Sequence, residues 1–438
     1  MALGETPGTH PPSSEVSRPK PPPRKLIVCC DGTWNKRDSI DEVTNVAKMA
    51  RVISPIDDSG ISQLIYYHPG VGTGNWWDKI AGGGLGEGLS ANVQGAYAFL
   101  VDNFQPGDFI YLFGFSRGAY TARSLAGLIG LVGLLSKADM DIFPQVYAIY
   151  RSIEHREKLV RGTEEDARTA IRALFPDSDV DKLAKRLLKA LDWNTRRTQI
   201  FFIGVWDTVG SLGVPDWPFK FGAKEYAFHD TEISNRIVYA YHALAIDESR
   251  GPFRPTLWTR KKDRGPDPKP QVLEQVWFAG CHSNVGGGYP DCGLSDIAFL
   301  WMASKAASAA RDANDRPLAF NEAYLREIVG RGKGALIESR TGPLWKLMPA
   351  YVRKVMETPA KDQKTGADME TCERIHESVV LRFRGKEADG FVPFPYAPAN
   401  AKSFLAGSDR SIIAELSEFE KSYRPKDVLP PAAPAPVT

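Results

Sequence analysis

The sequence has few cysteines and almost no net charge, and each of these two features argues against a class of protein. The five cysteines, Cys29, Cys30, Cys281, Cys292 and Cys372, are odd in number and lack the paired spacing of a metal site. We therefore predict that the cysteines are packing residues of a protein in a reducing compartment, and that they bind no metal. A formal net charge of +2 provides no basic surface for phosphate backbones, so no nucleic-acid partner is expected.

Long apolar runs are also missing. The N-terminus lacks the apolar segment of a secretory signal, and nowhere do about 18 apolar residues follow one another. We therefore expect no Sec-type signal, no membrane span and a cytoplasmic location, with export by a signal-less route left open. The Pro-rich start (1–24) and the Pro/Ala-rich end (425–438) are expected to be disordered tails.

The body of the chain, residues 25–424, is long enough for one elaborated enzyme-sized domain. Nearly continuous apolar runs of strand length recur in it, at Leu26–Cys30, Leu64–Tyr67, Phe109–Phe113, Ile200–Val205 and Gln275–Ala279. Such runs are typical of strands buried on both faces. Segments with helical spacing lie between several of them, at Leu89–Asn103, Ala119–Gly130 and Ser295–Ala310. This order predicts an α/β fold with a mostly parallel sheet and helices on both faces.

Two regions fit this pattern less simply. The polar and charged helical stretch at 139–194 separates two core strands, so we expect it to be a helical cap inserted into the domain. Beyond about Arg311 the signals weaken. The patterns there predict a strand at Ser378–Phe383 and a helix at Ser411–Tyr423.

The motif Gly114-Phe115-Ser116-Arg117-Gly118 joins an apolar strand directly to a helix. A serine hydroxyl becomes a useful nucleophile when a sharp strand-to-helix turn exposes it beside a base, and such a turn leaves no room for neighbouring side chains. Gly114 and Gly118 meet that requirement. The motif predicts Ser116 as the nucleophile of an α/β-hydrolase-like fold, with the Arg117 N–H as an oxyanion-hole donor.

A serine nucleophile of this fold needs an acid and then a histidine later in the chain. Asp207 directly follows the strand that ends at Trp206, and His282 follows the strand that ends near Ala279. We therefore predict a Ser116–Asp207–His282 triad. Taken singly, Asp207 is open to interpretation as a helix cap and His282 as a satisfied core histidine.

Rival residues remain for both roles. Asp247 and Asp296 are alternative acids, although Asp296 has the position of a helix-cap residue. His242 and His376 are alternative bases. The spacing of Tyr241–Leu244 is typical of a helix face, which predicts a core role for His242.

The first apolar run enters the loop that begins Asp31-Gly32-Thr33. In this fold such an early loop supplies the second oxyanion-hole donor, so we expect N–H groups of Gly32 and Thr33 to face Ser116. Asp31 has two open interpretations, an Asx-turn that holds the loop or a ligand for a cation.

Two glycine-rich stretches, Pro69–Gly74 and Gly82–Gly86, lack the Lys-Ser/Thr ending of a phosphate loop and the acidic ribose partner of a dinucleotide site. No nucleotide and no other cofactor is expected. A mobile loop carrying Trp76 and Trp77 at the mouth of an acyl pocket is the preferred interpretation.

Taken together, five blocks of the sequence resemble one known family: Cys30–Asn35, Thr44–Val46, Gly114–Ala119, Val205–Val209 and His282–Tyr289. The family is an α/β-hydrolase family long labelled a domain of unknown function, and its better-understood members are catalytic domains of type VI secretion phospholipase effectors. The resemblance covers roughly residues 25–310.

This resemblance implies the same triad, Ser116, Asp207 and His282, and phospholipase A-type hydrolysis of glycerophospholipid esters. Asn284 departs from the acidic residue that the family usually has after His-Ser. Type VI secretion becomes one signal-less export route, although the chain has no recognisable secretion adaptor.

The sequence therefore predicts a serine hydrolase that cleaves a carboxylic ester, with a lipid or phospholipid substrate, through an acyl-enzyme. Contact with a membrane would be transient and interfacial. The alternatives are an esterase or thioesterase for a soluble acyl substrate, and a non-catalytic binding module of the same fold. The sequence carries no signal for an oligomeric state.

Overall fold

The computed structural model of the chain describes residues 22–32, 42–70, 84–152, 155, 163–194, 198–209, 231–265, 270–310, 317–328, 334–341, 345, 350–357, 361, 365–384, 396–407 and 409–423. The tails expected at the two ends lie outside these residues, apart from 22–24. Thr33, Trp76 and Trp77 lie outside them as well, so the expectations about the early loop and the pocket mouth stay predictions.

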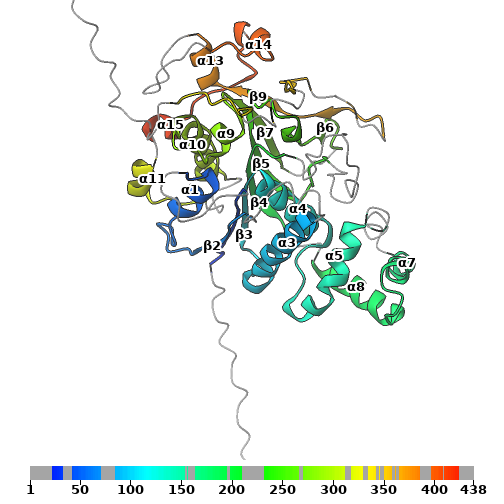
Figure 1. Cartoon of the computed structure of the whole chain (residues 1–438). Coiled ribbons are helices and arrows are strands. Elements are labelled where there is room, and N and C mark those ends of the chain that lie inside the picture. The colour runs from blue at the N-terminus through cyan, green and yellow to red at the C-terminus, as the bar shows by residue number, and fades with distance from the viewer. Residues whose placement is uncertain are drawn as a thin grey trace, which may run out of the picture.

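An eight-stranded sheet forms the centre of the molecule (Figure 1). Its order is β10-β9-β7-β5-β4-β3-β1-β2, and every strand pairing in it is parallel. The strands are β1 (Lys25–Cys30), β2 (Gln63–His68), β3 (Phe109–Phe115), β4 (Ile200–Trp206), β5 (Ile237–Ala245), β7 (Val272–Phe278), β9 (Glu373–His376) and β10 (Ile413–Ala414). Two further strands, β6 (Arg260–Lys261) and β8 (Met369–Glu370), form a small antiparallel pair. The predicted α/β fold with a mostly parallel sheet is confirmed.

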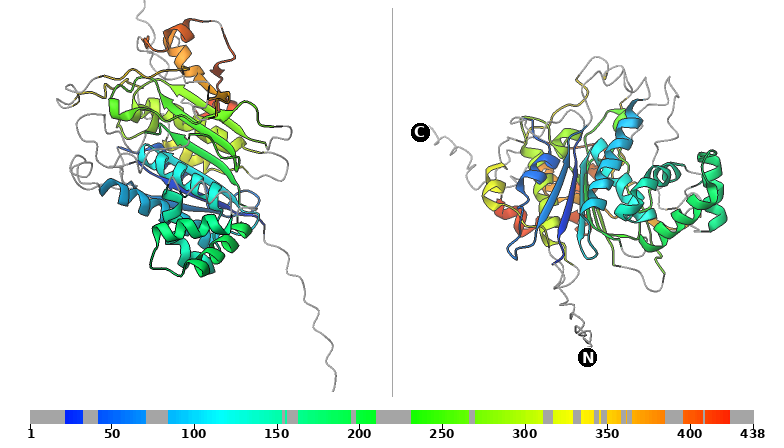
Figure 2. Two further views of the ribbon diagram at one scale, coloured as in Figure 1. Left: turned by 90° about the vertical axis from the view of Figure 1, so that its right-hand side faces the viewer. Right: turned by 90° about the horizontal axis from the view of Figure 1, so that it is seen from below.

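Helices cover both faces of this sheet (Figures 1 and 2). One layer contains α3 (Gly84–Asn103) and α4 (Arg117–Val132), and the other contains α1 (Asn45–Val52), α10 (Gly293–Ser308), α11 (Glu322–Ile328) and α15 (Glu418–Tyr423). Alternate residues of β1 enter the two cores: Leu26 and Val28 face the first layer, and Ile27 and Cys29 face the second. All of them are fully buried, which explains why the strand reads as one unbroken apolar run.

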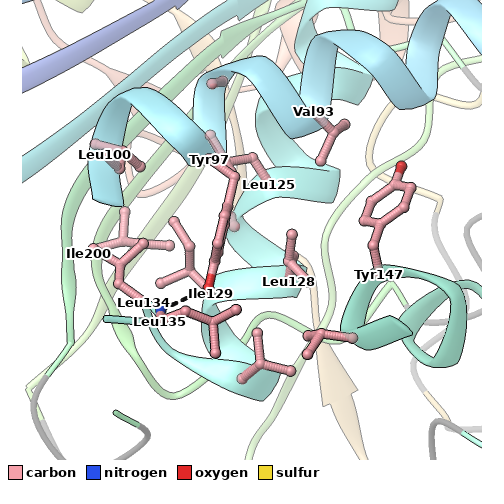
Figure 3. Packing of buried hydrophobic residues seen from close by; sticks show 14 of the residues in the cluster. Val93, Tyr97, Leu100, Leu125, Leu128, Ile129, Leu134, Leu135, Tyr147 and Ile200 are labelled. Atoms are coloured by element: carbon pink, nitrogen blue, oxygen red, sulfur yellow. Dashed lines mark hydrogen bonds between the residues drawn. The ribbon is translucent and has the colours of Figure 1, made fainter. Parts of the chain in front are cut away.

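The first layer packs around a buried tyrosine (Figure 3). Tyr97 of α3 stacks on Phe143, and its hydroxyl donates to the carbonyl of Gly133 and accepts from the Leu135 N–H, at 3.0 and 2.9 Å. The only polar atom of this side chain is thereby satisfied inside an apolar core. This contact holds the turn that follows α4, the helix that begins directly after the candidate nucleophile.

The predicted helical insertion lies between α4 and β4. It consists of a 3₁₀ helix (Lys137–Ile142), α5 (Phe143–Arg151), α7 (Glu164–Leu174) and α8 (Val180–Asn194). Its apolar side joins the first core through Ala170, Ile171 and Leu187. Charged residues of α7 and α8 form ion pairs, Arg168 with Glu164 and with Asp181. A lid function for this insertion stays a prediction.

Three predictions about secondary structure are wrong. Tyr241–Leu244 belongs to β5 instead of a helix, because its apolar side chains lie between two buried neighbours in the sheet. Residues 378–383 lie in α13 (Glu377–Phe383), whose N-terminus is capped by the His376 side chain accepting from the Ser378 N–H. The expected helix at 411–423 contains β10 first and reduces to α15.

The remaining elements are the short helices α9 (His282–Gly286) and α14 (Lys402–Ala406) and a 3₁₀ turn at Gly251–Phe253. All five cysteines are free thiols, and four of them are buried. Over the part of the chain that is described, no helix combines the length and the apolar character needed to cross a membrane.

Candidate active site

Ser116 occupies a sharp turn between β3 and α4. Its φ of 57° lies in the left-handed region, which a residue with a side chain adopts only where the surroundings force it. A Cβ on Gly118 would lie 2.0 Å from the Cys30 carbonyl oxygen, and one on Gly114 would lie 2.5 Å from the Gly118 carbonyl oxygen. Both glycines are therefore required by close backbone approach, as a strained elbow predicts.

The register of the sheet places Ser116 and Asp207 at the same level. Phe115, the last residue of β3, pairs with Trp206, the last residue of β4, and the Ser116 N–H donates to the Trp206 carbonyl at 3.1 Å. Asp207 then turns away from the strand with a φ of 39°, and its N–H donates to the Ala243 carbonyl of β5 at 2.7 Å. The two candidate residues thus leave neighbouring strands at one edge of the sheet.

His282, the first residue of α9, reaches the same edge just after β7. Its Nδ1 lies 2.6 Å from Asp207 Oδ2, and both side chains are buried. The rings of Phe115 and Phe253 pack against the imidazole, with centroids 4.6 and 4.9 Å away. His282 Nε2 is buried and has no hydrogen-bond partner, Ser116 included. The structure therefore joins acid and imidazole, and leaves the other imidazole nitrogen unpaired.

Four donors surround the Asp207 carboxylate. Besides His282, the guanidinium of Arg353 contacts both oxygens, at 2.5 Å (Nη1 to Oδ1) and 2.9 Å (Nη2 to Oδ2), and the Ala245 N–H donates to Oδ1 at 3.0 Å. Burial alone would raise the pKa of Asp207, but the charge of Arg353 and the bond from His282 outweigh it and hold this pKa well below the usual range. Asp207 is therefore ionised at neutral pH.

Burial has the largest effect on the pKa of the His282 imidazole. It lowers the pKa of His282 below the ordinary value of 6.5, and the nearby Asp207 carboxylate opposes this lowering only in part. A neutral imidazole whose Nδ1–H is held by a carboxylate has a free lone pair on Nε2, which is the form that a general base requires.

The rival acids and bases have other partners. Asp247 accepts from the Gly280 N–H at 2.6 Å and from the Tyr396 hydroxyl at 2.9 Å, and Asp296 forms a buried ion pair with Lys48. These two carboxylates therefore hold other parts of the fold, whereas the carboxylate on the His282 imidazole belongs to Asp207.

The two rival histidines are fully buried. His242 Nε2 accepts from the Thr208 N–H at 3.0 Å and Nδ1 lies 3.2 Å from Gln275 Oε1, while His376 pairs with Glu420 at 2.9 Å. His242 thus supports the turn next to Asp207 from β5, so it does have the predicted core role, on a strand instead of a helix.

The predicted oxyanion donors have different surroundings. Arg117 is the first residue of α4, so its N–H has no acceptor within the helix. The Gly32 N–H donates to Asp31 Oδ1 at 2.6 Å, and an oxyanion role for Gly32 would require this bond to open. Asp31 also accepts from Thr44 and Tyr67, which makes it a support of the loop. Within the described residues no cluster of His, Cys, Asp or Glu has the makings of a metal site.

A family model described as the catalytic domain of Tle1-like type VI secretion phospholipase effectors matches residues 24–305. The chain belongs to this family. The Tle1-like chain is also 30% identical over 264 residues to an uncharacterized protein of Saccharomyces cerevisiae, a match that covers 57% of this chain and 34% of the yeast protein. It thus spans about a third of that relative's length.

Two solved structures are similar to the Tle1-like chain. One is an uncharacterized protein from Pseudomonas aeruginosa, with a TM-score of 0.33 and 18% identity over 68% of this chain and 47% of that one. The other is the Tle1 effector bound to the VgrG spike of the type 6 secretion system, with a TM-score of 0.29 and 18% identity over 65% of this chain and 56% of that one. Family membership supports a phospholipase-like hydrolase.

Three charged residues of the Tle1-like candidate site, Glu248, Arg250 and Arg353, were not found from the sequence. Glu248 accepts from the backbone N–H of His282 at 3.2 Å and pairs with Arg250 at 2.8 Å. Arg250 in turn lies 3.7 Å above the ring of Phe253, which packs on the imidazole. Arg353 comes from a segment beyond the end of the family match. Glu248 follows Asp247 at a strand end, a usable signal, whereas Arg353 has no motif around it.

Proposed function

We propose that this chain is a carboxylic ester hydrolase of the phospholipase A type, which acts through an acyl-enzyme on Ser116. The observation that carries the proposal is the buried Asp207–His282 hydrogen bond, at the same sheet edge as the Ser116 elbow, with the outer nitrogen of the imidazole unpaired. Membership of the Tle1-like family supports a phospholipid as the substrate.

In the proposed reaction Ser116 Oγ attacks the ester carbonyl while His282 Nε2 takes its proton. Asp207 holds the tautomer of the imidazole and stabilises the imidazolium. The Arg117 N–H, at the N-terminus of α4, stabilises the oxyanion. The imidazolium then protonates the leaving alcohol, and water, activated by the same nitrogen, releases the fatty acid and restores the serine.

In this proposal the hydroxyl of Ser116 and His282 Nε2 form their hydrogen bond only when substrate is bound. Catalytic hydrogen bonds are often long or absent in a free enzyme and shorten in the complex. A buried nitrogen without a partner is unfavourable, so formation of this hydrogen bond in the complex removes a cost that the free site carries.

The decisive experiment is labelling with a fluorophosphonate probe, with Ser116→Ala as the matched variant. We expect the native chain to be labelled, the adduct to map to Ser116 by mass spectrometry, and Ser116→Ala to stay unlabelled while it remains folded. The probe reports an activated serine whatever the substrate is.

The same two proteins are then given phospholipid vesicles and a soluble p-nitrophenyl ester. Release of fatty acid and lysophospholipid, lost in Ser116→Ala, supports a phospholipase. Labelling with cleavage of the soluble ester alone would favour the esterase alternative. A folded native chain that neither labels nor hydrolyses would contradict the proposal and favour a non-catalytic binding module.

The pH dependence of the reaction follows from His282. A base must be neutral to act, and its lowered pKa means that activity is lost only as the pH falls below 6.5. We expect kcat/KM for the soluble ester to be still above half of its plateau at pH 6.5. A midpoint of the acidic limb above pH 6.5 would show that the imidazole is more exposed, or more strongly paired, than in this structure.

A further inference from the structure

We propose that Arg353 is a positioning residue of the active site: its guanidinium fork holds the Asp207 carboxylate in the orientation that accepts from His282. This inference rests on the proposed function and extends the catalytic unit beyond residue 305, where the family match ends. It assigns a role to the C-terminal part of the chain, for which no function was predicted from the sequence.

The contact is bidentate and fully buried. The two terminal nitrogens of Arg353 face the two oxygens of Asp207, and neither side chain has any exposed surface. A planar fork matched to a carboxylate fixes its rotation as well as its position, which a single point charge does not do. Oδ2 is thereby shared between Arg353 and His282, so the carboxylate cannot rotate without losing one of the two bonds.

Backbone carbonyl groups next to the candidate site hold the Arg353 guanidinium in place. Nη1 donates to the Ala245 carbonyl at 2.8 Å and Nη2 donates to the Phe253 carbonyl at 2.7 Å. Its own carbonyl accepts from Asn400 Nδ2 at 3.1 Å. The fork therefore ties the end of β5 and the turn that carries Phe253 to the acid, and a C-terminal loop holds the arginine in place.

The charge of Arg353 has a second effect. The charged groups around His282 are Asp207 from β4, Glu248 and Arg250 from the loop after β5, and Arg353 from the C-terminal part. Two carboxylates and two guanidinium groups balance one another. With Arg353 present, the attraction of Asp207 for an imidazolium is weakened, and His282 stays neutral and available as a base over a wider pH range.

The test uses Arg353→Gln and Arg353→Lys in the full chain, with Arg382→Gln as the matched control. Arg382 is a second buried arginine of the C-terminal part, and its Nη1 donates to the Gly334 carbonyl at 3.0 Å. The readouts are kcat/KM against pH for a soluble ester and the titration of the His282 imidazole by NMR, assigned among the seven histidines with His282→Gln.

We expect Arg353→Gln to lower kcat by about 100-fold with little change in KM. We also expect it to raise the midpoint of the acidic limb of the pH profile, and the pKa of the His282 imidazole, by about one unit. Arg353→Lys keeps the charge and loses the fork, so the limb stays in place while kcat falls. Arg382→Gln is expected to change neither. If Arg353→Gln is insoluble, Arg353→Lys decides the positioning role.

A native-like kcat in Arg353→Lys, or an unmoved limb and imidazole pKa in a folded Arg353→Gln, would overturn the inference and leave Arg353 as a structural residue. Failure of the proposed function looks different, because the native chain itself would then neither label nor hydrolyse. The imidazole titration needs no activity, so it reports on Arg353 in either case.

Discussion

Replacing Asp207 with asparagine is expected to lower kcat/KM by about four orders of magnitude. The asparagine amide can donate a hydrogen bond to the imidazole nitrogen from which the Asp207 carboxylate accepts one. The imidazole tautomer that leaves Nε2 free to act as a base is then lost. The change also leaves the Arg353 cation buried without a counter-charge, which costs about 3–5 kcal/mol of unfolding free energy. Steady-state kinetics and urea unfolding of the same preparation separate the two effects.

Asp296→Asn is the matched control. This carboxylate was a rival acid, it is fully buried and it pairs with Lys48, so its loss has a similar cost in stability. We expect kcat/KM per folded molecule to remain near native in Asp296→Asn. If Asp296→Asn, or the corresponding change at Asp247, abolished hydrolysis while Asp207→Asn kept it, the acid would have to be reassigned and the hydrolase function retained.

Gly118→Ala is expected to have the second largest effect. The added methyl group would lie 2.0 Å from the Cys30 carbonyl oxygen and 2.5 Å from that of Asp31, and both are backbone atoms that cannot rotate away. We expect a loss of about 3 kcal/mol in unfolding free energy and a fall of about 100-fold in the rate of fluorophosphonate labelling, because the elbow that carries Ser116 must move.

The same helix offers a control. A methyl group on Gly130 of α4 would meet the Ser234 hydroxyl at 2.8 Å, an atom at the end of a rotatable side chain. Gly130→Ala is therefore expected to be neutral or to stabilise by up to about 1 kcal/mol through helix propensity, with native labelling. Equal labelling rates in the two alanine variants would contradict the elbow geometry derived for Ser116.

The sequence was most informative where local pattern and tertiary environment agree. β1 and β4 are buried on both faces, so their apolar runs were read correctly as strands. β5 was misread because its alanines and leucine suit a helix as well, and only its place between β4 and β7 decides the matter. The short strands β9 and β10, which lie at one side of the sheet, leave too little pattern to detect.

Some residues of the candidate site could be predicted from the sequence and others could not, for the same reason. Ser116 has a local motif, and Asp207 and His282 each follow a strand that could be located, so their meeting at one sheet edge could be predicted. Arg353 could not be placed from the sequence, and the role of Glu248 could not be assigned, although its position at a strand end is a usable signal. Their roles depend on contacts between segments far apart in the chain, and nothing in the neighbouring residues of Arg353 encodes which carboxylate it will meet.

The position of Arg353 in the chain also affects when the candidate site can form during synthesis. A ribosome that adds roughly 5–20 residues per second makes Ser116, Asp207 and His282 several seconds before it reaches Arg353, and β9 and β10 come later still. Throughout that interval the nascent Asp207 lacks the cation that balances it in the finished fold. The candidate site with its Arg353 support thus cannot be complete until residue 353 has been made, which is well after its acid and its imidazole.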